Sequence, residues 1–185
     1  TIPKIISTIP FSGATGVAIT SVIAATFSEE MQSSTINTNT FTVSDGKGTI
    51  SGTVSYSGTT ATFTPLNKLP DSTTYTARIT IGVKDLAGNA LASDYTWSFT
   101  TIDITIPKII STIPVNGATG VAITSVIAAT FSEEMQSSTI NTNTFTVSDG
   151  KSNIGGTVSY NGMTATFTPF RNLSDSTTYT VRTST

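Results

Sequence analysis

The sequence predicts an all-β protein made of two tandem β-sandwiches of about seven to eight strands each. Thr and Ser account for 40 and 24 of the 185 residues, and charged residues for only 11%. Thr is β-branched and favours extended backbone. Aligning residues 1–81 with 105–185 leaves 15 mismatches, so 66 of 81 positions agree. Because the offset of 104 residues is the size of a small domain, the repeat indicates two domains rather than a solenoid.

The expected strands of the first unit are runs in which apolar and polar residues alternate, because alternate side chains of a strand share one face. They are the opening KIISTIP, the VAIT segment and the runs near residues 23–27, 41–43, 54–56, 61–63, 75–81 and 95–99. Turn sequences separate them, namely Ser12-Gly13, Asp45-Gly46, Ser57-Gly58, Pro70-Asp71 and DLAGN at residues 85–89. Short strands at this spacing are typical of a β-sandwich.

Aromatic residues mark the expected core of the first unit. In its last strand Tyr95, Trp97 and Phe99 alternate with polar residues, so we expect all three to face the core and Trp97 to be largely buried. Tyr56 and Tyr75 occupy the same kind of position in earlier strands. The alternation therefore predicts that the large rings pack inside the sandwich.

The repeat also predicts the domain boundaries. We expect a complete domain at residues 1–101, a short semi-rigid linker at 102–104 that contains no Gly or Ser, and a second domain at 105–185. The positions equivalent to 82–100 fall beyond Thr185, so the second sandwich is expected to lack its last strand. An open core beside an unpaired edge strand predicts strand exchange or edge pairing at this domain, in addition to contacts with neighbouring repeats.

One local feature predicts an immunoglobulin-like topology. LPDSTTY places Tyr75 just inside a strand after a turn, where its hydroxyl can bond to upstream backbone, as in a tyrosine corner. The Cys…Trp…Cys pattern of antibody domains is absent, because there is no Cys and the only Trp, Trp97, lies on the last strand. We therefore expect tandem immunoglobulin-like sandwiches that are not of the antibody type.

Seven motifs follow one another in the first unit: STIPFSGATGVAITSVIAATFSEEM, TFTV, GTVSY, ATFTP, LPDSTTYTARIT, GVKDLAGNAL and YTWSFTT. This succession resembles the bacterial Ig-like repeats first known from surface-layer proteins. The resemblance spans residues 1–101 and the same region of the second unit up to Thr185. It implies a stalk or spacer module of a secreted or cell-surface protein of bacteria or archaea. It implies no catalytic residues, because the family shares none.

Composition argues against several functional classes. The net charge is −2 and the nine cations are scattered singly, which is unlike a nucleic-acid-binding surface. No apolar stretch approaches the ~18 residues of a membrane helix, so we expect no membrane insertion. With no His and no Cys, the chain has no imidazole base, thiol nucleophile or ordinary zinc site. We therefore expect that the protein is not an enzyme.

An adjacent acidic pair, Glu29 and Glu30, is the most tempting catalytic candidate, and the repeat copies it. Adjacent residues of an extended strand point to opposite faces, whereas the two carboxylates of a glycosidase face one another across the substrate. We therefore interpret the pair as a solvated strand end. It is expected to lead into a short turn or helix that seats Met31 and Ile36.

Calcium is the one ligand that the sequence leaves open, because hard oxygen donors suit it. Asp85 and Asn89 lie in a loop near the domain end, and Asp103 lies in the junction TIDITIP. Acidic residues are sparse and form no dense cluster there, so we expect no cofactor. The triplet 172–174, Asn-Leu-Ser, matches an N-glycosylation sequon, a pattern that Ser/Thr-rich sequence produces easily by chance.

Two functional classes remain open. The first is a structural spacer, in which rigid repeated domains hold another part of the protein away from the cell. The second is an adhesive or carbohydrate-binding accessory module, which usually presents exposed aromatic residues. The core-facing pattern of the aromatic residues favours the spacer, at an extracellular or cell-surface location.

Overall fold

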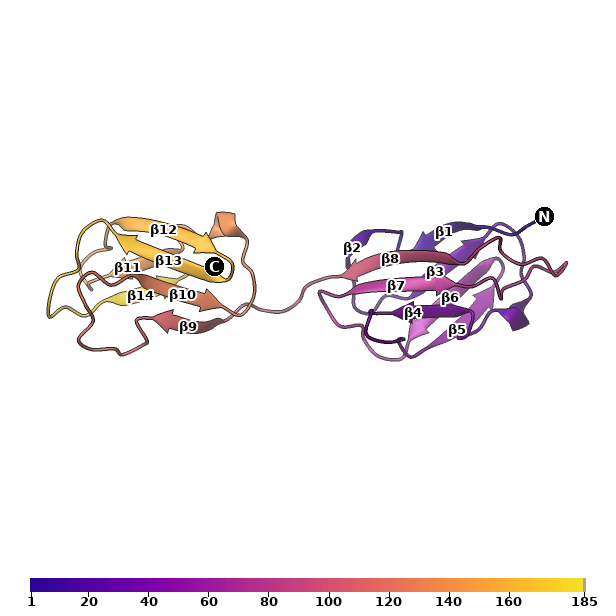
Figure 1. Ribbon diagram of the computed structural model, residues 1–185, viewed down its shortest axis with the longest axis horizontal. Helices are drawn as coiled ribbons and strands as arrows, with labels where there is room; N and C mark the ends of the chain where they lie inside the picture. The colour runs from indigo at the N-terminus through magenta and orange to yellow at the C-terminus, as the bar shows by residue number, and fades with distance from the viewer. Residues whose placement is uncertain (185) are drawn as a thin grey trace. The chain divides into compact units, whose positions relative to one another are not determined.

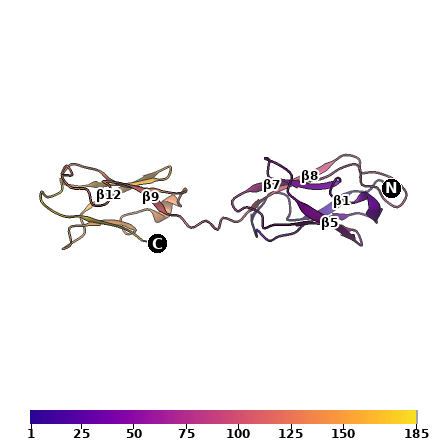
Figure 2. The same ribbon diagram turned by 90° about the horizontal axis from the view of Figure 1, so that it is seen from below.

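The chain forms two β-sandwiches, and the predicted all-β fold is confirmed. The computed structural model describes residues 1–184. Unit 1 comprises Thr1–Thr105 and unit 2 comprises Ile106–Thr185. Each unit consists of two facing layers of strands (Figure 1, Figure 2). Within the described residues, the only helical segments are two short 3-10 turns, Ser33–Thr35 and Ser137–Thr139.

Unit 1 contains eight strands in two four-stranded sheets. The strands are β1 (Ile5–Ile9), β2 (Ala14–Val17), β3 (Ile23–Phe27), β4 (Phe41–Ser44), β5 (Gly52–Ser57), β6 (Thr60–Pro65), β7 (Thr74–Ile79) and β8 (Tyr95–Thr101). One sheet has the order β1-β3-β6-β5 and the other β2-β8-β7-β4. Neighbouring strands are antiparallel, except that β2 and β8 are parallel.

The core of unit 1 lies between these sheets, where alternate side chains of the facing strands meet. In β7, for example, buried and exposed residues alternate through all six positions. The ring of Phe41 lies 5.9 Å from that of Phe63 and 5.9 Å from that of Trp97, measured between ring centroids. Phe41 thereby links the two sheets. Trp97 is only 3% exposed, so its predicted burial is confirmed.

The predicted tyrosine corner is present in unit 1. The hydroxyl of the buried Tyr75 donates a hydrogen bond to the carbonyl oxygen of Pro70 at 3.4 Å. In unit 2 the equivalent Tyr179 hydroxyl instead accepts a bond from the backbone N–H of Ser174 at 2.8 Å. The two bonds differ in direction because proline has no N–H to donate, whereas the serine at the equivalent position has one.

Three sequence expectations for unit 1 are wrong in detail. Tyr95 is 37% exposed, because it lies at the very start of β8; its ring is tilted by 49° against that of Trp97, with the ring centroids 5.9 Å apart. β7 ends at Ile79 rather than at residue 81, and Ile81 is 54% exposed. β2 covers residues 14–17 instead of the VAIT segment, because its position is set by pairing with β8 and not by side-chain alternation.

Within residues 106–184, unit 2 repeats this architecture but has no strands equivalent to β2 and β8. Its strands are β9 (Ile109–Ile113), β10 (Ile127–Phe131), β11 (Phe145–Ser148), β12 (Gly156–Asn161), β13 (Thr164–Pro169) and β14 (Thr180–Thr183). The first sheet has the order β12-β13-β10-β9, and the second contains β11 and β14. The part of unit 2 that the structure describes lacks the last strand of the sandwich, as predicted.

Candidate functional site

The acidic pair lies at a strand end, as the sequence analysis expects. β3 ends at Phe27, and the half-buried Glu29 accepts a hydrogen bond from the Thr1 hydroxyl at 2.8 Å. Glu30 is exposed. The short 3-10 turn that follows separates the buried side chains of Met31 and Ile36. The pair therefore lies at a partly solvated strand end, with Glu29 bonded to Thr1.

Asp85 and Asn89, two of the three calcium candidates, lie together in a closed loop. Asp85 is buried, and its two carboxylate oxygens accept hydrogen bonds from the Asn89 backbone N–H at 2.8 Å and from the Asn89 side-chain amide at 2.7 Å. The backbone N–H of Asp85 donates to the Asn89 carbonyl oxygen at 2.9 Å. The side-chain amide of Asn89 lowers the pKa of Asp85 below its ordinary value of 3.8. The carboxylate is thus satisfied by protein donors.

Asp103, the third candidate, lies away from this loop. The loop precedes β8 and Asp103 follows it, and the seven residues of β8 span about 23 Å. One carboxylate oxygen of Asp103 accepts a bond from the Thr105 N–H at 2.9 Å, which closes a local turn. Within residues 1–184, no group of three or more acidic side chains lies close enough to hold a metal ion. The structure thus brings two of the three candidates together.

Asp71 was predicted only as part of a turn, but its carboxylate also forms hydrogen bonds with the predicted linker and with Thr105. One of its carboxylate oxygens accepts hydrogen bonds from the Ile104 N–H at 3.4 Å and from the Thr105 hydroxyl at 3.0 Å. The Ile102 N–H donates to the Val17 carbonyl oxygen at 2.8 Å. These bonds hold residues 102–105 against unit 1, whose compact region extends through Thr105.

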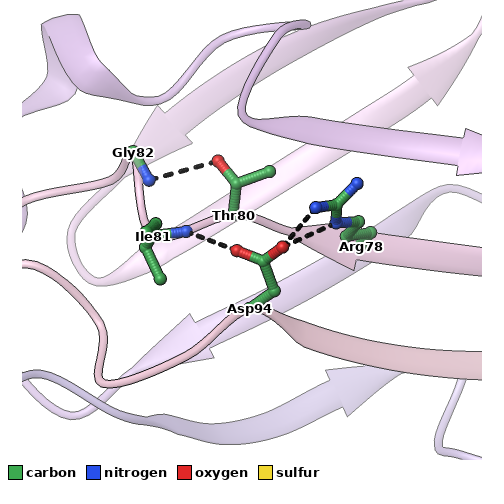
Figure 3. A network of polar contacts seen from close by, with 5 residues as sticks. All are labelled: Arg78, Thr80, Ile81, Gly82 and Asp94. Atoms are coloured by element: carbon green, nitrogen blue, oxygen red, sulfur yellow. Dashed lines mark hydrogen bonds and ion pairs between the residues drawn. The ribbon is translucent and has the colours of Figure 1, made fainter.

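A second polar network, also unexpected from the sequence, closes the other end of β7 (Figure 3). The guanidinium of Arg78 forms an ion pair with Asp94, with its Nε 2.9 Å from a carboxylate oxygen. The other carboxylate oxygen of Asp94 accepts a bond from the Ile81 N–H at 2.8 Å. The side-chain bond from Arg78 holds the pKa of Asp94 below its ordinary value of 3.8. The network joins residues 16 positions apart, so no local pattern could have predicted it.

Unit 2 carries a groove of about 940 Å³ whose lining is partly apolar and partly polar. Its two walls are residues 112–121, with Ile123, Ile127 and Ala128, and residues 173–181. The wall at 173–181 leads into β14, the edge strand of the short second sheet. The groove therefore lies beside the edge of β14.

The family to which these two sandwiches belong follows from a sequence comparison. A family model described as a bacterial Ig-like domain matches residues 1–101 and residues 103–185. The chain belongs to the bacterial Ig-like domain family. The match covers both units, so the pair is a tandem of bacterial Ig-like domains, as the motif succession had indicated.

Solved structures similar to this bacterial Ig-like pair include the N-terminal part of the bacterial S-layer protein SbsC. That similarity has a TM-score of 0.44 at 15% sequence identity, over 99% of this chain and 44% of that one. The structure of SbsC domains 1–6 has a TM-score of 0.44 at 15% identity, over 98% of this chain and 32% of that one. Native Escherichia coli alpha-2-macroglobulin has a TM-score of 0.44 at 14% identity, over 80% of this chain and 8% of that one.

The bacterial Ig-like pair therefore spans less than half the length of each of these three proteins. No curated protein matches its sequence. Within the described residues, no helix is both long and apolar enough to span a bilayer.

Proposed function

We propose that the chain is a non-catalytic structural spacer of a secreted or cell-surface bacterial protein. The observation that carries this proposal is the course of the backbone through unit 1. Thr1 lies beside the loop that precedes β8, because its carbonyl oxygen accepts a hydrogen bond from the Asn89 side chain at 3.3 Å. The chain leaves the sandwich after β8, its last strand, which ends at Thr101. The chain thus enters at one end of the sandwich and leaves at the other (Figure 1).

This course suits a module that carries load. Tension between the two ends of unit 1 acts along β1 and β8, and the hydrogen bonds that hold these strands run across that direction. The bonds from Gly13 N–H to Ser98 O at 2.7 Å and from Ile102 N–H to Val17 O at 2.8 Å are examples. They must break together in shear rather than one by one, so unit 1 should resist extension.

The distribution of aromatic rings supports a spacer over an adhesive or carbohydrate-binding module. Tyr75, Trp97 and Phe99 are buried in the core. The exposed rings among residues 1–184 are those of Phe11, Tyr95 and Phe170, and no two of them pack against each other. The exposed rings described here thus do not form the kind of cluster on which an aromatic binding face is built.

Single-molecule force spectroscopy tests the proposal. The 185-residue chain is pulled from its two ends, and unit 1 is expected to unfold in one step with a distinct force peak. Pulling on unit 1 through cysteines introduced at Thr53 and Thr64 is the control. These exposed residues pair near the open end of the β5–β6 hairpin, so their hydrogen bonds are peeled open one after another at lower force. Equal forces in both geometries, or saturable binding of the chain to a glycan array, would contradict a spacer role.

The location is tested on cells that produce the parent protein. Antibodies raised against residues 1–184 should label intact, unpermeabilised cells or the culture medium. Labelling only after permeabilisation would contradict an extracellular location.

We also propose that the fold requires no calcium, because the carboxylate oxygens of Asp85 already accept protein hydrogen bonds. The melting temperature of unit 1 is expected to be the same in excess EDTA and in millimolar calcium. A rise with calcium that Asp85→Asn abolishes would instead assign a site to this loop.

A further inference from the structure

Asparagine is followed by glycine at two places in the chain, Asn116–Gly117 and Asn161–Gly162. Both asparagines stand where unit 1 has serine, at Ser12 and Ser57. The side-chain amide of asparagine lies within reach of the backbone nitrogen of the next residue, and glycine obstructs the approach least because it has no Cβ atom. Whether the two groups react in a folded protein depends on the hydrogen bonds that hold them.

Asn161 is the last residue of β12 and leads into the tip of the β12–β13 hairpin. It is exposed and pairs with Thr164, so Gly162 and Met163 form a two-residue loop. Gly162 has a φ of +57°, a value that suits glycine at the first position of such a loop. Gly58 has a φ of +58° in the equivalent loop of unit 1. The two units thus build the same turn, although serine precedes the glycine in one and asparagine in the other.

Both reacting groups of the Asn161–Gly162 step are free within residues 1–184. The N–H of Gly162 donates to no acceptor, and the side-chain amide of Asn161 forms no hydrogen bond. A Cβ atom at Gly162 would meet nothing within 4 Å, so the space around this glycine is open. The amide can therefore reach the Gly162 nitrogen when the tip of the hairpin frays, without breaking a bond of its own.

Elsewhere in the fold the same kinds of group are held by hydrogen bonds. The side-chain oxygen of Asn141 accepts a bond from the Asn143 N–H at 2.9 Å. The N–H of Gly13, at the other Ser–Gly step of unit 1, donates to the Ser98 carbonyl oxygen at 2.7 Å. A group held in this way must break its bond before it reacts, so the hairpin tip is the more reactive place.

We propose that Asn161 is a site of spontaneous deamidation. The backbone nitrogen of Gly162 attacks the side-chain carbonyl carbon Cγ of Asn161, and a bond forms between these two atoms. The bond from Cγ to the side-chain nitrogen breaks, and that nitrogen leaves as ammonia, which takes up the proton of the Gly162 N–H. The product is a cyclic imide. Water then hydrolyses one of its two carbonyl–nitrogen bonds, which leaves aspartate or isoaspartate at this position.

The reaction changes both the charge and the backbone of the hairpin tip. Either product carries a carboxylate, which adds one negative charge to the formal net charge of −2. In isoaspartate the backbone runs through Cγ and is one carbon longer. This tip also contacts β10, because the Met163 carbonyl oxygen accepts a bond from the Phe131 N–H at 2.8 Å. Water is the only co-reactant, so the modified fraction should increase with the age of the chain.

The reaction is followed by peptide mapping with mass spectrometry while the full 185-residue chain is incubated at mildly alkaline pH. Loss of the amide adds about 1 Da and produces an acidic variant in ion-exchange chromatography. We expect the modification at Asn161, and we expect Asn161→Ser, which restores the residue of unit 1, to remove it. An unmodified Asn161, or modification at Asn116 alone, would overturn the proposal.

Two variants of unit 1 separate the effect of the turn from that of the sequence. Ser57→Asn and Ser12→Asn each place asparagine before glycine at an exposed position, so both chains are expected to fold normally. Ser57→Asn should deamidate as Asn161 does, because the Gly58 N–H has no acceptor within the described residues. Ser12→Asn should deamidate at least about tenfold more slowly, since the N–H of the glycine after it is bonded. Equal rates in the two variants would show that the fold does not select the site, and the proposal would fail.

Discussion

Phe41 connects the two sheets of unit 1 through rings on both sides of it. Its neighbours Phe63 and Trp97 come from strands of different sheets, and all three residues are at most 3% exposed. Burying a large side chain of this kind contributes about 1.5–3 kcal/mol to folding. The stability of the domain therefore depends strongly on a few aromatic residues, although hydroxyl residues dominate the composition.

Truncation of the buried indole should be costly. Trp97→Ala is expected to lower the free energy of unfolding of unit 1 by about 3–5 kcal/mol, because it leaves a cavity beside Phe41. Thermal unfolding followed by circular dichroism measures this loss. Tyr95→Ala is the matched control and should cost less, because Tyr95 is 37% exposed. Equal losses for the two variants would show that Trp97 does not occupy the core position described.

A glycine provides a second test at the residue scale. A Cβ atom at Gly52 would collide with the ring of Phe63, whereas a Cβ at Gly48 would meet no atom within 4 Å. Gly52→Ala should therefore destabilise unit 1 by about 1–3 kcal/mol. Gly48→Ala should be nearly neutral, since unit 2 has Ser152 at the equivalent position. Denaturant unfolding followed by Trp97 fluorescence distinguishes the two, and comparable destabilisation would contradict the packing of Phe63.

At the scale of elements, the segment from Gly82 to Asp94 closes one end of unit 1 through two carboxylates. Asp85 bonds Asn89 within the loop, and Asp94 bonds Arg78 and the Ile81 N–H at the end of β7. The pKa of each carboxylate is lowered, in both cases first by the side-chain hydrogen bond that it accepts. The folded state therefore favours the ionised form of both groups.

These lowered pKa values predict how stability depends on pH. The contribution of each carboxylate is fully present above the ordinary aspartate pKa of 3.8 and is lost as the pH falls through the lowered folded-state pKa. The stability of unit 1 should therefore fall as the pH drops from about 5 to about 2. Asp94→Asn should make unit 1 less stable at neutral pH but reduce the acid-dependent loss. A variant with an unchanged pH profile would contradict the ion pair in Figure 3.

At the scale of the whole molecule, the two domains differ far more in core size than in sequence. The buried hydrophobic cluster of unit 1 contains 18 residues, whereas that of unit 2 contains seven. Only 15 of 81 equivalent positions differ. Much of the difference therefore comes from the segment equivalent to residues 82–101, which unit 1 contains and the described part of unit 2 does not.

Calorimetry of the 185-residue chain should consequently resolve two unfolding transitions, with unit 2 melting first. Because Trp97 is the only tryptophan, its fluorescence should change only in the upper transition. A single transition in which calorimetry and Trp97 fluorescence coincide would show that the two units unfold cooperatively.

Local patterns in the sequence were sufficient to predict most of the fold. The alternation of apolar and polar residues located the buried residues of β3, β4, β6 and β7. The internal repeat predicted that the same elements recur in unit 2. The burial of Trp97 and the tyrosine corner at Tyr75 followed from positions within one strand. These features were predictable because the period of two along a strand is a local property of the chain.

The features that the sequence did not reveal depend on residues that are distant along the chain. Ala-Thr-Gly-Val forms strand β2 at residues 14–17, but the identical residues 118–121 form no strand. The difference arises because β2 exists only by pairing with β8, more than 80 positions away. The Arg78–Asp94 ion pair also joins separate segments, as do the hydrogen bonds from Ile104 and Thr105 to the Asp71 carboxylate. The sequence by itself thus determined which face of most strands is buried. The tertiary structure decided the burial of residues at strand ends, such as Tyr95 and Ile81, and which backbone edges find a partner, because strand hydrogen bonds form between segments rather than within them.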